Sequence, residues 1–361
     1  MMKKILRNKI CSVISIVTTG IMLVGCLAGC GSGNGQTASG VQNGSASGDG
    51  RKVGTEAGIQ VVTTIFPEYD WVREILGDNP GNAEVTLLLD NGVDLHNYQP
   101  TAADILKIAT CDVFIYVGGE SDEWVEDALA EAANKDMVVI DLLETLGDKV
   151  KEEEVVEGME AEEDHDHTDG EHADGYHDEE EETEYDEHVW LSLKNAAVLC
   201  DVIADTLAQK DAGNADVYQT NLERYKSRLA ALDADYQSAV AAGAKNTVLF
   251  GDRFPFRYLT DDYGLSYYAA FVGCSAETEA SFETIVFLSN KTDELELSSI
   301  MKIESSDGKI AETIRNNTKA KDQKILTLDS MQSTTSKDVK NGTTYLSIME
   351  SNLNVLREAL N

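Results

Sequence analysis

The chain has 361 residues, of which 42% are hydrophobic and 26% are charged. This composition is typical of a soluble globular protein large enough for two domains, and it argues against a disordered or membrane-embedded chain. The formal net charge of −36 at pH 7 disfavours nucleic acid and anionic membrane surfaces as partners and favours cations.

Residues 1–30 are typical of an export signal. Basic residues between Lys3 and Lys9 precede an apolar run from Ile10 to Leu27, which ends in small residues. A membrane-spanning helix is the alternative interpretation. Serine, threonine and glycine weaken the run, however, and no cluster of positive charge follows it.

The end of the signal resembles a bacterial lipobox. In Leu27–Cys30 the cysteine would carry the lipid, so we expect a mature chain that begins at lipidated Cys30, with Cys26 as a second candidate. Residues 31–58 are rich in glycine and serine and almost free of large apolar side chains. They predict a flexible tether that holds the folded part close to the membrane.

Residues 59–192 predict a first α/β lobe. Pro67 suits the first turn of a helix, Thr101 begins a capping box, and 120–133 predicts a further helix. Between these helix signals lie short apolar runs that we expect to form a parallel sheet covered on both faces. The expected strands are Ile59–Ile65, Val85–Leu89, Val113–Val117 and Met137–Leu142.

An acidic stretch over residues 151–187 interrupts the end of this lobe. Residues 152–187 contain about twenty aspartates and glutamates and no lysine or arginine, so the rest of the chain is only moderately acidic. Self-repulsion and the scarcity of apolar residues predict a disordered loop. It carries the chain's auxiliary candidate metal ligands, His165, His167, His172 and His177.

Residues 193–245 predict helices that join this lobe to a second one. Ala215–Ala242 contains no glycine or proline and has a broad apolar stripe, as expected for a long rigid helix. Residues 246–361 then repeat the alternation of strands and helices. The expected strands are Thr247–Phe250, Leu265–Phe271, Ser299–Ile303 and Ile325–Leu328, and the expected helices are Glu277–Leu288, Lys309–Asn317 and Tyr345–Leu360.

These patterns predict an α/β fold of two lobes, each with a mostly parallel sheet of four strands, joined by the long helix. Three cysteines, Cys111, Cys200 and Cys274, remain beyond the leader. They lack the spacing of a zinc knuckle, and we interpret them as small buried residues.

Two histidines lie outside the acidic loop, and both lie where an extended segment meets a helix. His96 stands in Gly92–Thr101 and His188 in Asp186–Leu191. Imidazole is a common transition-metal ligand, and such strand ends line the crevice where open α/β sheets bind ligands. A histidine that only completes a local hydrogen-bond network is the alternative.

In this order and spacing, several segments resemble the zinc- and manganese-binding solute-binding lipoproteins of ABC importers, a family of metal receptors and adhesin-like lipoproteins. The resemblance covers nearly all of residues 59–361. The matching segments are Val61–Pro67, His96–Thr101, Asp186–Ala196, Tyr263–Leu265, Gly273–Ser281 and Tyr345–Leu360.

This resemblance implies a metal site in the cleft between the lobes, with one ligand from each of four loops. His96 and His188 match the first two ligands, and Asp329 matches the fourth. Glu304 matches an acidic residue beside the site. The third position falls within Gly251–Tyr258, where this chain has no histidine.

Two alignments of the third position remain. Counting back from Tyr258 without a gap gives Arg253, a permanent cation that cannot bind a metal, and a shift by one residue gives Asp252, which can. We expect Asp252 to be the ligand and Arg253 to pair with an acidic neighbour or contact the other lobe. The alternative for Asp252 is a helix cap or a pair with Arg253 outside the site.

The resemblance implies an extracytoplasmic, lipid-anchored receptor, expected to be monomeric, that delivers Zn2+, or alternatively Mn2+, to an ABC importer permease. Carboxylate ligands favour manganese, and the histidine-bearing acidic loop favours zinc, although that loop could also be a merely solvated run of charge. A surface adhesin is the alternative function. The sequence argues against an enzyme, since it contains no H-E-x-x-H motif and the folded part contains no G-x-S-x-G motif.

Overall fold

The computed structural model describes residues 58–160, 184–275 and 279–361. The chain divides into two units, residues 1–54 and 55–361, and every described residue belongs to the second unit. The leader, the lipobox with Cys26 and Cys30, the tether up to residue 57, and the four loop histidines therefore lie outside the described residues. Within the described ranges, no helix is both long and apolar enough to cross a membrane.

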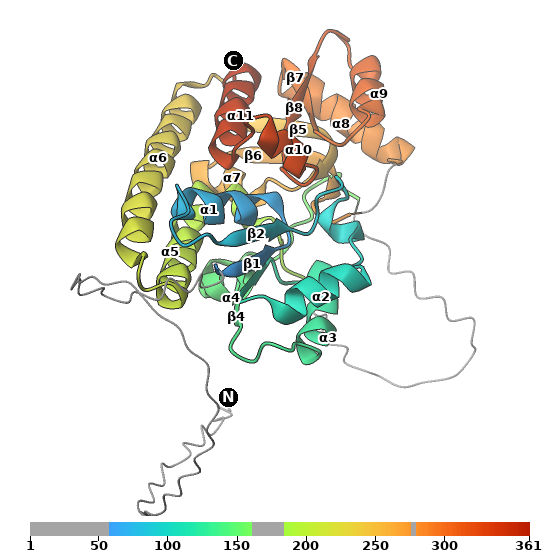
Figure 1. The fold of residues 1–361 in the computed structure, drawn as a ribbon. Coiled ribbons are helices and arrows are strands. Elements are labelled where there is room, and N and C mark those ends of the chain that lie inside the picture. Colours follow the sequence, from blue (N-terminus) through green and yellow to red (C-terminus); the bar gives the residue numbers. More distant parts are fainter. Residues whose placement is uncertain (1–57, 161–183, 276–278) are drawn as a thin grey trace, which may run out of the picture. The chain divides into compact units, whose positions relative to one another are not determined.

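The first lobe is built on a parallel sheet whose strands lie in the order β2–β1–β3–β4 (Figure 1). Most residues of the central strands are buried, which matches their nearly continuous apolar sequence. The strands are β1 (Gln60–Thr63), β2 (Glu84–Leu87), β3 (Val113–Tyr116) and β4 (Val138–Asp141). The helices are α1 (Phe66–Leu76), α2 (Ala102–Thr110), α3 (Trp124–Ala130) and α4 (Leu142–Leu146), with short 3-10 helices η1 (Leu95–Asn97), η2 (Glu120–Asp122), η3 (Gly147–Lys149) and η4 (Val189–Leu191).

The second lobe repeats this arrangement in the order β6–β5–β7–β8, again with parallel pairings. A separate apolar core fills the space between this sheet and two of its helices, α8 and α9. The strands are β5 (Thr247–Phe254), β6 (Ser266–Val272), β7 (Ser299–Ile303) and β8 (Lys324–Leu328). The helices are α7 (Arg257–Tyr263), α8 (Phe282–Glu294), α9 (Lys309–Asn317), α10 (Ser336–Lys340) and α11 (Tyr345–Ala359).

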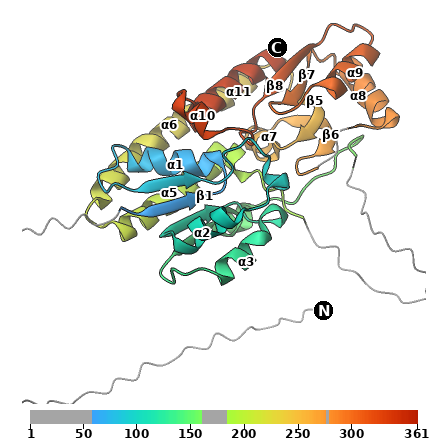
Figure 2. The ribbon, with the colours of Figure 1, turned by 45° about the vertical axis from the view of Figure 1, so that its right-hand side comes forward.

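The helices α5 (Leu193–Lys210) and α6 (Ala215–Ala242) join the lobes. Helix α6 has 28 residues and packs against α1 and α5 of the first lobe and α11 of the second (Figures 1 and 2). The Tyr236 hydroxyl donates to the Met349 carbonyl at 2.6 Å, and Asn221 donates to the Ile75 carbonyl at 3.0 Å. One apolar core contains residues of α6 and of both lobes, so the helix fixes the two lobes relative to each other.

The structure confirms the predicted fold class and the bounds of α6. Other elements differ in extent from the sequence prediction. The region 120–133 contains η2 and α3 instead of one helix, and α8 begins at Phe282, where Ser281 caps it, instead of at Glu277. Strand β5 continues to Phe254, beyond the predicted end at Phe250, because its register against β6 shifts and the pairing then resumes.

Both ends of the acidic segment are ordered, which corrects the prediction of a disordered loop over 151–187. The Glu153 amide donates to the Glu184 carbonyl at 2.9 Å, and the Asp186 amide donates to the Lys151 carbonyl at 2.9 Å. Backbone pairing between the two ends outweighs their charge repulsion at this point.

Contacts with β6 extend the ordered part as far as Glu160. The Glu160 amide donates to the Ala270 carbonyl at 2.9 Å, and Met159 is buried against the main core. Gly158 lies at φ +81°, where a Cβ would collide with the Phe287 ring. The segment up to Glu160 therefore belongs to the folded lobe.

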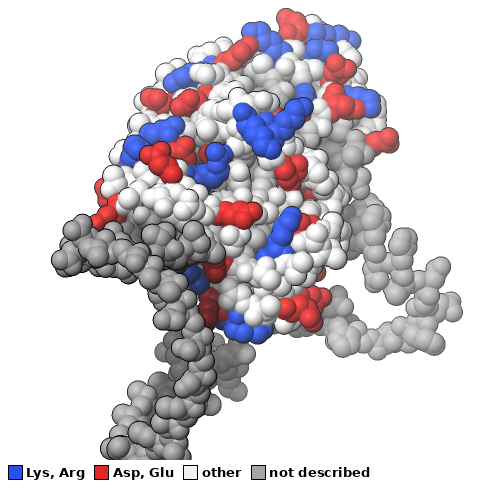
Figure 3. Space-filling view, viewed as in Figure 1, with Lys and Arg blue, Asp and Glu red and all other residues white. Residues whose placement is uncertain are grey.

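The face shown in Figure 3 carries acidic and basic side chains interspersed with one another. This mixture agrees with a folded part that is only moderately acidic. Much of the chain's negative charge instead belongs to residues 152–187.

Asp70 joins α1 to the beginning of α11. Its buried carboxylate accepts a hydrogen bond from the Tyr345 amide at 2.8 Å, which satisfies a backbone donor at the helix start. Burial raises the pKa of Asp70 to about 6 in spite of this hydrogen bond. The contact is therefore sensitive to pH.

We expect Asp70→Asn to remove part of the pH dependence of stability. The folded state holds the Asp70 proton up to about pH 6, whereas the unfolded chain loses it near pH 4, so the wild-type free energy of unfolding falls as pH rises between these values, by about 3 kcal/mol from this group. Urea unfolding across this range measures the effect, with the exposed Asp78→Asn as the control. If plots of the unfolding free energy against pH ran parallel for the wild type and Asp70→Asn, Asp70 would not be the source of this pH dependence.

A second prediction separates the ordered ends of the acidic segment from residues 161–183. Replacing 161–183 by a Gly/Ser linker of equal length should leave the melting temperature unchanged. Extending the replacement back to residue 152 should lower it, because the burial of Met159 and the Glu160 contact to β6 are lost. Equal melting temperatures for the two replacements would show that 152–160 contributes nothing to the fold.

Candidate metal centre

His96 lies in η1, on the connection between β2 and α2. The Asp94 carboxylate accepts from the His96 amide at 3.2 Å and so caps the short helix, while the fully buried Leu95 fixes it to the core. The His96 Nδ1 lies 2.7 Å from the Ser121 hydroxyl and 3.5 Å from a Glu187 carboxylate oxygen. The backbone and the Nδ1 atom are thus both held in place.

His188 is fully buried immediately before η4. The Asp186 Oδ1 atom lies 2.9 Å from its amide and 3.1 Å from its Nδ1, so this carboxylate fixes both the backbone and the ring. Gly273 lies against the ring, and a Cβ there would come within 3.0 Å of the His188 Cε1 atom. A larger residue at 273 would displace the imidazole.

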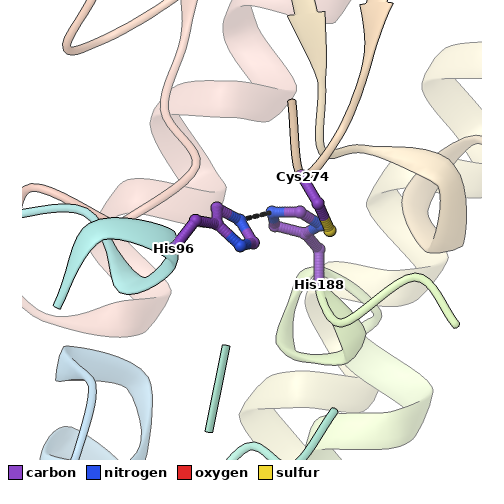
Figure 4. A group of neighbouring side chains, drawn as sticks. All are labelled: His96, His188 and Cys274. Atoms are coloured by element: carbon purple, nitrogen blue, oxygen red, sulfur yellow. Dashed lines mark hydrogen bonds between the residues drawn. The ribbon is translucent and has the colours of Figure 1, made fainter. Parts of the chain in front are cut away.

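The Nε2 atoms of the two histidines face each other at 3.2 Å (Figure 4). A carboxylate near each Nδ1 favours the tautomer with the proton on that atom, which turns the Nε2 lone pairs towards each other. Two nitrogens at tetrahedral positions on zinc lie about 3.3 Å apart, given Zn–N bonds of about 2.0–2.1 Å. The observed separation fits a shared metal ion.

The charge state also suits metal binding. Burial, together with the neighbouring His188, lowers the pKa of His96 to about 3, so the ring is neutral at physiological pH. Burial likewise raises the pKa of Glu187, although the Ser121 amide stabilises its charged form with a hydrogen bond of 2.9 Å. A neutral imidazole keeps its lone pair for a cation.

Cys274 is the third residue that the structure brings to this point (Figure 4). Its Sγ atom and one nitrogen of each histidine all lie within 4.8 Å of one another, and in the described ranges these three form the group that could hold a metal ion. Sequence reasoning interpreted Cys274 only as a small buried residue. The signal that could have identified it is its position immediately after β6, preceded by glycine.

Asp252 lies outside this group. Its Oδ1 accepts from the Arg253 amide at 3.0 Å and its Oδ2 accepts from the Ile303 amide at 3.3 Å, so both oxygens serve the backbone where the β5 register shifts. Burial raises the pKa of Asp252. In this structure the carboxylate joins β5 to β7, and its metal-ligand role stays a prediction.

Arg253 forms an ion pair with Asp94 and so contacts the first lobe. This pairing matches both roles expected for the arginine. Burial alone would raise the pKa of Asp94, but the charge of Arg253, the neighbouring His96 and the hydrogen bonds from both residues together hold that pKa below its usual value. Asp94, Asp252 and Arg253 line a cavity of ≈ 740 Å³ between the lobes.

Gln332 connects the same aspartate to the metal-binding histidine pair. With its amide oriented to satisfy both neighbours, the nitrogen donates to the Asp94 carboxylate at 2.7 and 3.1 Å, and the oxygen accepts from His188 Nε2 at 3.1 Å when that nitrogen carries the ring proton. The Gln332 side chain therefore lies beside His188 on the side of the second lobe.

Asp329 also lies outside the group that Cys274 and the histidines form. Its Oδ1 accepts from the Met331 amide at 2.8 Å, and burial together with Glu304 raises the pKa of Asp329 to about 7. Glu304 accepts from the Ser330 amide at 2.8 Å and so holds the loop after β8. The metal-ligand role of Asp329 stays a prediction.

Comparisons with known proteins agree with a metal site. Residues 61–359 match a family model described as zinc-uptake complex component A, periplasmic. The zinc-binding lipoprotein AdcA of Streptococcus pneumoniae is 30% identical over 300 residues, which make up 83% of this chain and 55% of that protein. The high-affinity zinc uptake system protein ZnuA of Bacillus subtilis is 28% identical and is matched over 84% of this chain and 88% of its own. The chain thus spans about half the length of the first relative.

A solved structure shares the fold. The Zn(II)-bound ZnuA-like domain of Streptococcus pneumoniae AdcA superimposes with a TM-score of 0.64 at 25% identity. The match covers 84% of this chain and 99% of that one.

We expect His96→Ala and His188→Ala each to weaken metal binding by two orders of magnitude or more, on the order of the several kcal/mol that one metal–ligand bond contributes. Asp186→Asn should weaken it about 10- to 100-fold, because it disturbs the His188 tautomer without removing a ligand. Competition titration with zinc measures each affinity, and circular dichroism checks that the metal-free fold survives. Unchanged affinity in either histidine variant would exclude that residue as a ligand.

Proposed function

The chain belongs to the family of periplasmic zinc-uptake complex component A proteins, and from this membership we propose that it captures Zn2+ outside the cytoplasm and delivers it to the permease of an ABC importer. The zinc ion is the cargo of this process. The protein's task is to bind the ion selectively and to release it to the transporter.

The observation that carries the proposal is the pair of buried Nε2 atoms 3.2 Å apart. Imidazole nitrogens bind a borderline metal such as zinc well, and carboxylates beside both rings orient them. The two Nε2 atoms can form a hydrogen bond with each other only if one of them carries a proton. A metal ion can instead bind to both nitrogens when neither is protonated.

We propose a receptor and not an enzyme. Hydrolytic zinc sites combine three protein ligands with an open position for water and a general base, often within an H-E-x-x-H motif that this sequence lacks. The family is one of metal-binding transport receptors.

The proposed location is the outer face of the cell membrane, with the protein held by a lipid on Cys30 or, in the alternative, on Cys26. The tether over residues 31–58 would keep a monomeric receptor near its permease. His165, His167, His172 and His177 would collect additional zinc within the acidic loop.

Asp329 remains the proposed carboxylate ligand from the second lobe. Its hydrogen bond to Met331 uses Oδ1, and the Glu304 carboxylate beside it raises the local negative potential that a dication would relieve. Asp252 is the weaker candidate because both of its oxygens accept from backbone amides.

Metal analysis of the purified protein tests the function. We expect tight zinc bound at the inner site, preferred over manganese, and additional weaker zinc that is lost when residues 161–183 are replaced by the Gly/Ser linker. Asp329→Asn should lower inner-site affinity by an order of magnitude or more, and Asp252→Asn should lower it less. Absence of any tight metal site would refute the proposal and leave the adhesin alternative.

A further inference from the structure

Resting on the proposed zinc capture, we propose that the Cys274 thiolate is a ligand of the transported metal, which makes the inner site a mixed imidazole–thiolate centre that selects soft and borderline cations over manganese. This assignment concerns a residue of the second lobe. His96 and His188 belong to the first lobe, so Cys274 would let the metal bridge the two.

Distance supports the assignment. The Cys274 Sγ and one nitrogen of each histidine lie within 4.8 Å of one another. In a tetrahedral zinc site with Zn–S of about 2.3 Å and Zn–N of about 2.0–2.1 Å, sulfur and nitrogen lie about 3.5 Å apart. The three side chains are thus close enough for a shared ion, and the Nε2 atoms of the two histidines are 3.2 Å apart.

The backbone holds Cys274 at this point. Gly273 fits against the His188 ring, and the Cys274 amide donates to the Glu153 carboxylate at 3.3 Å. Glu153 in turn belongs to the ordered end of the acidic segment, where its amide pairs with the Glu184 carbonyl. The cysteine is thus fixed between the end of β6 and the base of the acidic loop.

Charge around the thiol favours a cation. Cys274 lines a cavity of ≈ 230 Å³ whose other acidic residues are Glu120, Glu123, Glu153, Glu184 and Glu187. Carboxylates so close to a thiol oppose a free thiolate, but a bound dication compensates both the thiolate and its neighbours. When the metal binds, the S–H bond breaks, the sulfur pair forms the metal–sulfur bond, and the proton passes to solvent or a carboxylate.

The ligand set explains selectivity. Thiolate and imidazole suit zinc, cobalt, cadmium and copper(I), whereas manganese prefers carboxylate and water oxygens. The charge of Arg253 is offset by its ion pair with Asp94, which weakens its repulsion of an incoming dication. The proposed site is therefore distinct in its donor atoms from one built of histidines and carboxylates.

Cobalt(II) substitution of the full-length protein tests the inference. The wild type should show a thiolate-to-cobalt charge-transfer band in the near ultraviolet at one cobalt per inner site. Cys274→Ser should lose the band, bind zinc roughly tenfold or more weakly, and discriminate less against manganese. The matched control Cys111→Ala removes a thiol that is distant in sequence and buried elsewhere, and it should keep the band.

A second measurement does not depend on the folding of a variant. Zinc should protect Cys274 of the wild type from alkylation by iodoacetamide, whereas labelling of the buried Cys111 and Cys200 should not respond to zinc. Cobalt binding without the band, or alkylation of Cys274 that zinc does not slow, would overturn the thiolate ligand and leave the proposed zinc capture standing. Failure of the wild type to bind either metal would overturn both.

Discussion

Two ring nitrogens, the Nε2 atoms of His96 and His188, face each other at 3.2 Å, a separation at which they could share a hydrogen bond or a metal ion. Two buried nitrogens that both lack a proton destabilise the metal-free protein, whereas a bound dication would stabilise them. The surroundings support it, since Asp186 fixes the His188 ring, and Ser121 with Glu187 fixes the His96 ring. The supporting hydrogen bonds therefore prepare the two nitrogens before the metal arrives.

Rigid packing makes this arrangement compatible with a site shared by two lobes. Helix α6 contacts helices of both lobes, and a common core runs through it. Asp70 and Trp190 add hydrogen bonds that cross from one lobe to the other, and Tyr236 adds one from α6 to the second lobe. The Trp190 ring also lies 5.2 Å from the His188 ring, so the packing that joins the lobes extends to the candidate metal site.

The charged side chains around the candidate site fall into those that face it and those that are paired with other groups. Carboxylates near the histidines and Cys274 attract a dication, while the single arginine beside them is paired with Asp94. Asp252 and Glu304 are used on backbone amides, which places them in the framework of the second lobe. The described ends of the acidic segment meet at the same place, where the Glu153 amide donates to the Glu184 carbonyl.

The sequence alone determined the two α/β lobes and the α6 spine and identified His96 and His188 as candidates, because hydrophobic period, capping residues and strand-end position are local signals. It could not determine the use of Asp252, since only the shifted register of β5 turns that carboxylate onto the Ile303 amide. Nor could it separate Cys274 from the buried Cys111 and Cys200. The three look alike along the chain, and only the folding of β6 against the His188 loop brings one thiol within reach of two imidazoles.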